Sequence, residues 1–148
     1  MKPIQDIAQA ILDKNILYAI TYTAVFNTIS GAFLSTTLMG IIFPMPVLVM
    51  VERGLFIGLL YGDIPGNFFY YLVILGTIIL EFGAYIISAS LGVNIGLSLF
   101  WPKRFETKNR WKAFGKAWME VFRVYPLIIL ILLISAVWEI GGLYLLVN

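Results

Sequence analysis

Two long stretches with almost no charge place the strongest constraint on the fold of this chain. Residues 15–51, between Lys14 and Glu52, carry no charged side chain, and residues 64–102 carry only Glu81. A helix crosses the bilayer core with about 20 apolar residues, so both stretches are long enough to cross. The chain is 12% charged, whereas soluble domains are about 25% charged, so polar side chains are too few to cover a water-soluble globule. The sequence therefore predicts an all-α membrane protein.

Breaks within these stretches divide the chain into helices. Pro44 and Pro46 interrupt the first stretch, because proline removes a helical hydrogen bond and disfavours helix at the preceding residue. The segment YGDIPGN, residues 61–67, has the composition of a turn. The sequence leaves open whether the second and third hydrophobic helices cross simply or re-enter. We expect one membrane domain, residues 1–148, with about four transmembrane helices: an interfacial amphipathic helix at 1–14, and hydrophobic helices at 16–40, 46–62, 68–101 and 125–147.

The segment 103–123 carries most of the basic residues of the chain. It holds seven of the ten Lys and Arg residues, which by the positive-inside rule predicts that it faces the cytoplasm at the cell membrane. Its aromatic side chains fall on one helical stripe with basic side chains opposite, a pattern typical of a helix at a lipid surface. We expect membrane lipids as its partner, with a membrane or cytoplasmic protein also compatible, and no nucleic acid. The candidate lipid-surface residues are Trp111, Lys112, Lys116, Trp118 and Arg123.

Three glutamates occur within the hydrophobic segments, and each needs compensation there. A charge at the bilayer centre costs about 2.5–3.5 kcal/mol on insertion scales, so Glu52, Glu81 and Glu139 are expected to face helix contacts. Arg53 is the only basic residue at comparable depth, so at most one glutamate can pair closely with it. The others would be neutral, hydrogen-bonded or balanced by a cation. A packing role and a role on an ion or proton path both fit these side chains.

Small residues recur every four positions in two of the predicted helices. These ladders are Gly54, Gly58 and Gly62 in the second helix, and Ala84, Ser88, Gly92 and Gly96 in the third. Such faces let another helix backbone approach closely. At 3.6 residues per turn, Glu81 shares a face with the second ladder, and Glu139 shares one with Ser135 and Gly142. We therefore expect both glutamates in helix contacts, within one chain or between the copies of a homo-oligomer.

The composition removes several kinds of chemistry. The chain has no Cys and no His, which excludes disulfides, thiolate or imidazole metal ligands, and catalysis by those side chains. The sequence also lacks a phosphate-binding loop of the GxxxxGK type and a dinucleotide fingerprint. We expect no enzyme activity, no cofactor and no metal site.

The third hydrophobic segment resembles a known family signature. The stretch LEFGAYIISASLGVNIG, residues 80–96, resembles the signature of the stage II sporulation protein M-like family of integral membrane proteins. VERGLFIGLLYG, residues 51–62, and SAVWEI, residues 135–140, are similar to two further segments of that family. From Asn27 onward most of the chain takes part in the resemblance. The residues that match the signature are Glu81, Ala84, Gly92 and Gly96, with Gly54, Gly58, Ala136 and Glu139 in the other two segments.

The chain departs from the family pattern at two places. Thr77 and Ile78 stand where members often have His-Gly, and Asn94 stands where a basic residue is common. The resemblance implies a polytopic membrane protein of a family not known as enzymes. It also implies a scaffold role, since the named sporulation member recruits cell-wall-cutting partners.

Two functions remain compatible with the sequence. The favoured interpretation is a non-enzymatic membrane protein of the scaffold or assembly type, self-associating through its small-residue helix faces. The alternative is a homo-oligomeric ion or proton channel or transporter that uses its intramembrane carboxylates, Glu81 and Glu139. A pore needs a continuous polar stripe, whereas the sequence displays isolated acids with small neighbours, and this favours the scaffold.

Overall fold

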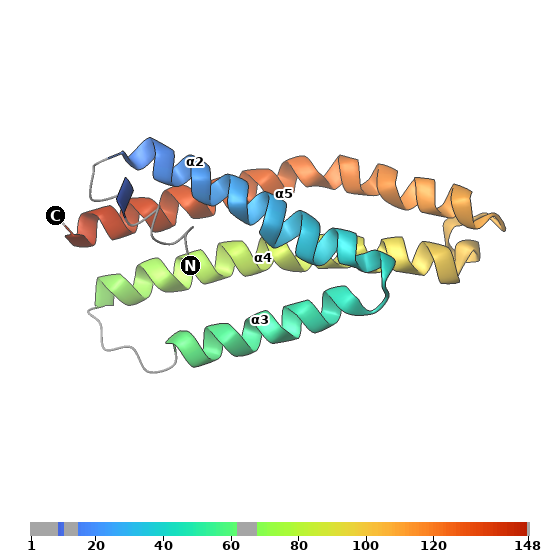
Figure 1. The fold of residues 1–148 in the computed structure, drawn as a ribbon, viewed down its shortest axis with the longest axis horizontal. Helices are drawn as coiled ribbons and strands as arrows, with labels where there is room; N and C mark the ends of the chain where they lie inside the picture. The colour runs from blue at the N-terminus through green and yellow to red at the C-terminus, as the bar shows by residue number, and fades with distance from the viewer. Residues whose placement is uncertain (1–8, 11–14, 62–67, 148) are drawn as a thin grey trace.

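The protein is a bundle of long helices packed side by side (Figure 1). A computed structural model describes residues 9–10, 15–61 and 68–147, and these residues contain no strand. The main helices are α2 (Ile16–Phe26), α3 (Met45–Tyr61), α4 (Phe68–Phe100) and α5 (Arg110–Val147). α2 continues into a π-helical segment, η1 (Asn27–Thr37), and a short 3-10 turn, η2 (Leu38–Ile41).

The segments run in alternating directions along the bundle (Figure 1). Among the described residues, three helical stretches are long and apolar enough to cross a membrane: Ile16–Ile41, Phe68–Phe100 and Arg110–Leu146. This confirms the predicted all-α membrane fold. α3 has 17 residues, which gives a length of about 25 Å, somewhat less than the roughly 30 Å of a bilayer core. It runs beside α4 with many apolar side chains exposed along it.

The predicted basic helix 103–123 and the predicted last span 125–147 are wrong as separate elements. α5 is one helix of 38 residues with Pro126 inside it, preceded by a short 3-10 turn, η3 (Pro102–Phe105). One buried stripe continues at helical spacing on both sides of Pro126, so packing holds the helix together despite one lost hydrogen bond. That stripe comprises Ala113, Ala117, Val121, Ile128, Leu132, Ala136 and Ile140.

The continuity of α5 changes the place of the basic segment. α4 has 33 residues and α5 has 38, so they are about 50 and 57 Å long, well beyond the bilayer core. Their connection projects past α3 and η2 as a helical hairpin, at the end opposite the C-terminus (Figure 1). The basic residues therefore extend along the bundle axis and do not form a separate helix. The membrane face that they occupy stays a prediction.

Some predicted elements lie outside the described residues. The interfacial helix at 1–14 is described only at residues 9 and 10, and Gly62 and most of the YGDIPGN turn are not described. The break at Pro44 and Pro46 is seen, since η2 ends at Ile41 and α3 begins at Met45.

Small residues bring η1 and η2 against α4 at backbone distance. Ala84, Ser88, Gly92 and Gly96 are all buried in this contact, which we call the glycine seam. A Cβ atom built on Gly92 would lie 3.0 Å from Pro46 Cγ and 3.1 Å from the Thr37 carbonyl oxygen, and one on Gly40 would clash with the Gly92 backbone. The glycine seam determines which face of η1 packs against α4. It thereby directs the polar side chains of η1 toward α4.

Candidate functional site

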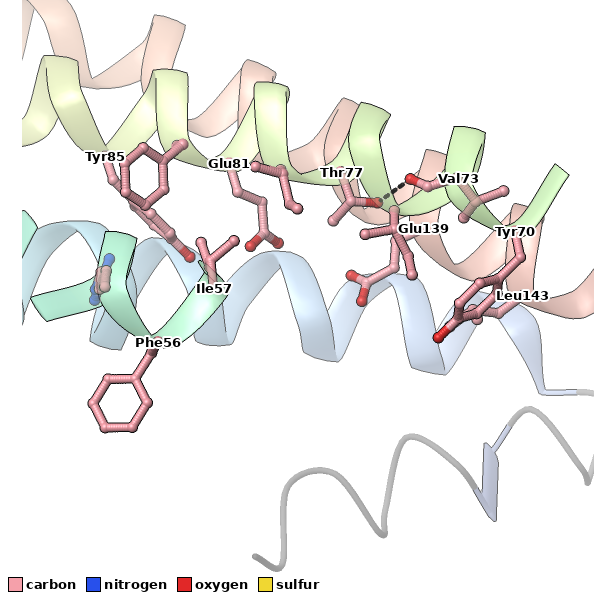
Figure 2. A pocket seen from close by; sticks show the side chains of 13 residues that line it. Phe56, Ile57, Tyr70, Val73, Thr77, Glu81, Tyr85, Glu139 and Leu143 are labelled. Carbon is pink, nitrogen blue, oxygen red and sulfur yellow. Dashed lines mark hydrogen bonds between the residues drawn. The ribbon is translucent and has the colours of Figure 1, made fainter. Parts of the chain in front are cut away.

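A cavity of about 400 Å³ lies between α3, α4 and α5, and we call it the carboxylate cavity (Figure 2). Glu81 of α4 and Glu139 of α5 both line it, and Figure 2 shows their carboxyl groups turned to the same side, with Thr77 between them. Both side chains are half-buried. The cavity is lined by Arg53, Phe56, Ile57, Tyr70, Val73, Ile74, Thr77, Ile78, Glu81, Phe82, Tyr85, Glu139 and Leu143.

A tryptophan contact fixes α5 so that Glu139 enters the cavity. Trp138 donates a hydrogen bond from Nε1 to the Val73 carbonyl oxygen of α4 at 3.0 Å. Its indole also covers Gly76, where a Cβ atom would clash with the ring. Because neighbouring residues on a helix point about 100° apart, this contact turns Glu139 toward the cavity.

Glu81 is held by a residue that the sequence reading did not single out. Asn27 Nδ2 donates a hydrogen bond to Glu81 Oε1. Asn27 is the first residue of η1, where the helix widens from α to π geometry. Single-turn π segments are often found at functional sites, and this one extends over 11 residues. Glu81 therefore joins α4 to η1.

Arg53 reaches the cavity from α3 but makes its hydrogen bonds to η1. Its Nη2 atom donates to the Gly31 carbonyl oxygen at 2.9 Å and to Ser35 Oγ at 2.6 Å. The guanidinium lies over the Tyr85 ring, 4.2 Å from the ring centroid. Its Nη1 atom is buried and has no hydrogen-bond partner among the described residues. Arg53 thus fixes α3 to η1, and it adds one positive charge beside the two carboxyl groups.

Glu52 forms no buried helix contact with the described part of this chain, and a contact between copies stays a prediction. Glu52 is exposed on the outer face of α3, because Arg53, the next residue, points inward and successive side chains diverge by about 100°. Gly54 and Gly58 are also exposed, and a Cβ atom on Gly58 would meet nothing within 4 Å. Among the described residues, Gly58 therefore forms no close helix contact, whereas a Cβ atom on Gly54 would lie 3.7 Å from the Phe82 ring of α4.

A group of hydroxyls, which we call the hydroxyl cluster, lies further along the glycine seam and consists of the buried Thr36, Thr37 and Ser88 with the half-buried Tyr125. Ser88 Oγ lies 2.7 Å from both threonine hydroxyls and donates to the Ala32 carbonyl oxygen at 2.8 Å. Thr37 Oγ1 also lies 2.9 Å from Tyr125 Oη. Ser88 is seven residues beyond Glu81 on α4, a rise of about 10 Å toward the basic end.

Sequence reasoning missed the polar contribution of η1. Its segment NTISGAFLSTT supplies Asn27, the Gly31 carbonyl and Ser35 to the cavity side, and Thr36 and Thr37 to the hydroxyl cluster. The signal was present as a run of Asn, Ser and Thr in a predicted membrane helix. Periodicity alone gave no reason to place this run beside Glu81.

The candidate lipid-surface residues fall into two groups. Trp111 is 78% exposed, and Lys112, Lys116 and Arg123 are also exposed. Trp118 is half-buried and packs 6.2 Å from the Phe33 ring, so it faces the bundle and only partly the outside.

The chemistry available in the carboxylate cavity is that of two carboxyl groups, an amide, hydroxyls and one guanidinium. No group of three or more His, Cys, Asp or Glu able to hold a metal ion occurs among the described residues. Two carboxyl groups beside apolar walls suit a proton or a single positive charge.

Comparison with known proteins identifies a family. The sequence model of the family described as Stage II sporulation protein M matches residues 3–140. That range includes Asn27, Arg53, Glu81 and Glu139. No curated protein and no solved structure matches the chain.

Proposed function

The chain belongs to the Stage II sporulation protein M family of helical membrane proteins, and from that premise we propose that it binds and conducts protons or monovalent cations. One observation carries the proposal: Glu81 and Glu139, on different helices and 58 positions apart in the sequence, line one cavity. Intramembrane carboxylates that face a cavity are typical of ion and proton paths.

The charges around the carboxylate cavity favour a cation. Two ionised carboxyl groups and Arg53 sum to one negative charge, since −2 and +1 give −1. An unbalanced charge is costly away from water, so this arrangement favours binding one proton or one monovalent cation. The hydrogen bonds of Arg53 to η1 hold it in place, so it does not swing to neutralise either glutamate.

The polar groups beyond the cavity support passage toward the basic end. Ser88 of the hydroxyl cluster lies two turns beyond Glu81 on the same face of α4, with Ala84 between them. It is closed by packing in this conformation, with Thr36, Thr37 and Ser88 fully buried. We take this as the closed state, in which conduction requires η1 to move relative to α4.

A flux measurement tests the proposal. Purified protein in liposomes should conduct protons or potassium above empty liposomes, and Glu81→Gln or Glu139→Gln should abolish that flux. Glutamine keeps an oxygen that accepts the Asn27 hydrogen bond, so the fold should remain while the charge is lost. Glu52→Gln is the matched control, because Glu52 is exposed outside the cavity. Absence of flux, or wild-type flux in the Glu81→Gln protein, would contradict the proposal.

The outer face of α3 favours a second function, the self-associating scaffold. Gly54 and Gly58 are exposed, and the space around Gly58 is open, so another α3 could approach there. Gly58→Leu should then reduce oligomer size in detergent while leaving the bundle folded, measured by light scattering during gel filtration. Gly115→Leu is the control, since Gly115 is also open but lies on α5. An unchanged mass for Gly58→Leu would argue against association through α3.

A further inference from the structure

We propose that the carboxylate cavity binds a small amphiphile with a single ammonium group. The ammonium would lie between Glu81 and Glu139, with its apolar body against the walls. This inference rests on the proposed cation site and names the class of ligand that the site takes.

The size of the cavity is the first argument. A cavity needs only about 10–15 Å³ to hold one water, whereas this cavity has about 400 Å³. Sites for small organic molecules measure about 300–1,000 Å³ and have mostly apolar walls with a few polar groups. The cavity therefore has the volume of an organic ligand site, well beyond what a single ion requires.

The second argument is that the polar and apolar residues lining the cavity lie on different parts of its wall. Polar groups gather around Thr77, Glu81 and Glu139, as Figure 2 shows. Arg53, Tyr70 and Tyr85 add further polar groups to the lining, and the rest of the wall is apolar. Burying each CH₂ of a ligand against such a wall is favourable in water. The apolar lining residues are Phe56, Ile57, Val73, Ile74, Ile78, Phe82 and Leu143.

The third argument concerns the charge and hydrogen bonding of the ligand. A primary ammonium has three donors and no acceptor, which matches two carboxyl groups that can both accept. The cavity's net charge of −1, with both carboxyl groups ionised, is balanced by one ammonium. A dication would leave an excess positive charge, and the described residues offer no cluster of three acids for a divalent metal.

The α3 side provides an entrance from the membrane. A Cβ atom on Gly58 of α3 would meet no described residue within 4 Å, and Phe56, 57% exposed, points away from the carboxyl groups in Figure 2. A ligand that partitions into the bilayer could therefore reach the cavity sideways between α3 and α4. This route suits an amphiphile better than a hydrated ion.

Titration calorimetry of the full chain in detergent with three probes tests the inference. Hexylamine should bind at least tenfold more tightly than hexanol, which lacks the charge, and than methylamine, which lacks the apolar body. Glu81→Gln and Glu139→Gln should each weaken hexylamine binding at least tenfold. Equal binding of hexylamine and hexanol would overturn charge recognition, and equal binding of hexylamine and methylamine would overturn the apolar subsite.

A wall substitution separates the apolar subsite from folding effects. Ile57→Phe narrows the cavity from the α3 side and should weaken hexylamine at least fivefold, with methylamine unchanged. Leu59→Phe is the matched control on the same helix, because Leu59 is 82% exposed and does not line the cavity. Equal effects of the two variants would overturn the assignment.

The source of the ammonium group is a further arm of the experiment. Hexylamine binding is compared in nanodiscs of phosphatidylethanolamine and of phosphatidylcholine. Weaker hexylamine binding in phosphatidylethanolamine than in phosphatidylcholine would identify a lipid headgroup as the competing ligand. Equal hexylamine binding in the two lipids would favour a free amine as the ligand. Both results support recognition of an ammonium group. Flux without hexylamine binding would reject this inference alone, whereas binding without flux would reject only the proposed conduction.

Discussion

Gly92→Leu is expected to prevent the bundle from folding. Gly92 faces the backbone of η1, and a Cβ atom there would clash with the Thr36 carbonyl oxygen and lie 3.0 Å from Pro46 Cγ. These neighbours are backbone and a proline ring, so they cannot rotate away as a flexible side chain would. Overpacking a core usually costs about 1–3 kcal/mol, and a whole leucine side chain against backbone should exceed that range. Against a total stability of about 5–15 kcal/mol, this loss is severe.

The control for this substitution lies on the same helix. Gly83 of α4 has nothing within 4 Å of its Cβ position, so Gly83→Leu should keep the wild-type unfolding temperature. Thermal unfolding and gel filtration in detergent measure both proteins. A Gly92→Leu protein with the wild-type midpoint and a single symmetric peak would show that the seam is looser than described.

Arg53→Met is expected to release α3 from η1 and to lower the free energy of unfolding by about 3 kcal/mol. Each hydrogen bond from a charged group contributes about 1.5–3 kcal/mol, and packing of the methionine side chain offsets part of the loss of two such bonds. The bonds lost are those to the Gly31 carbonyl oxygen and Ser35 Oγ, together with the contact to the Tyr85 ring. Glu81 and Glu139 would also lose the positive charge that Arg53 adds to the cavity lining. Hydrogen exchange should accelerate in α3 and η1 more than in α5.

An exposed arginine provides the comparison. Arg123 lies on the surface of α5, so Arg123→Met should change stability by no more than about 0.5 kcal/mol. Exchange in α3 that stays at the wild-type rate in Arg53→Met would mean that apolar packing, and not Arg53, holds α3 in place.

The sequence by itself determined the class of fold and the residues of one helix contact. Stretches of uncharged residues longer than a bilayer crossing require helices in lipid, because a backbone in hydrocarbon must satisfy its own hydrogen bonds. The four-residue spacing of Ala84, Ser88, Gly92 and Gly96 put them on one face, and the structure buries all four against η1 and η2. Periodicity is a local property, so it can be read without knowing the neighbours.

Only the tertiary structure decided which faces meet. Glu81 and Glu139 share a cavity because α4 and α5 pack in one register, fixed by contacts such as Trp138 to Val73. Asn27 reaches Glu81 through the π-helical turn of η1, which no pattern in the sequence predicted. The continuity of α5 through Pro126 likewise follows from its packing against the rest of the bundle. Helical spacing assigns a residue to a face of its own helix, but the partner of that face depends on the packing of residues distant in the chain.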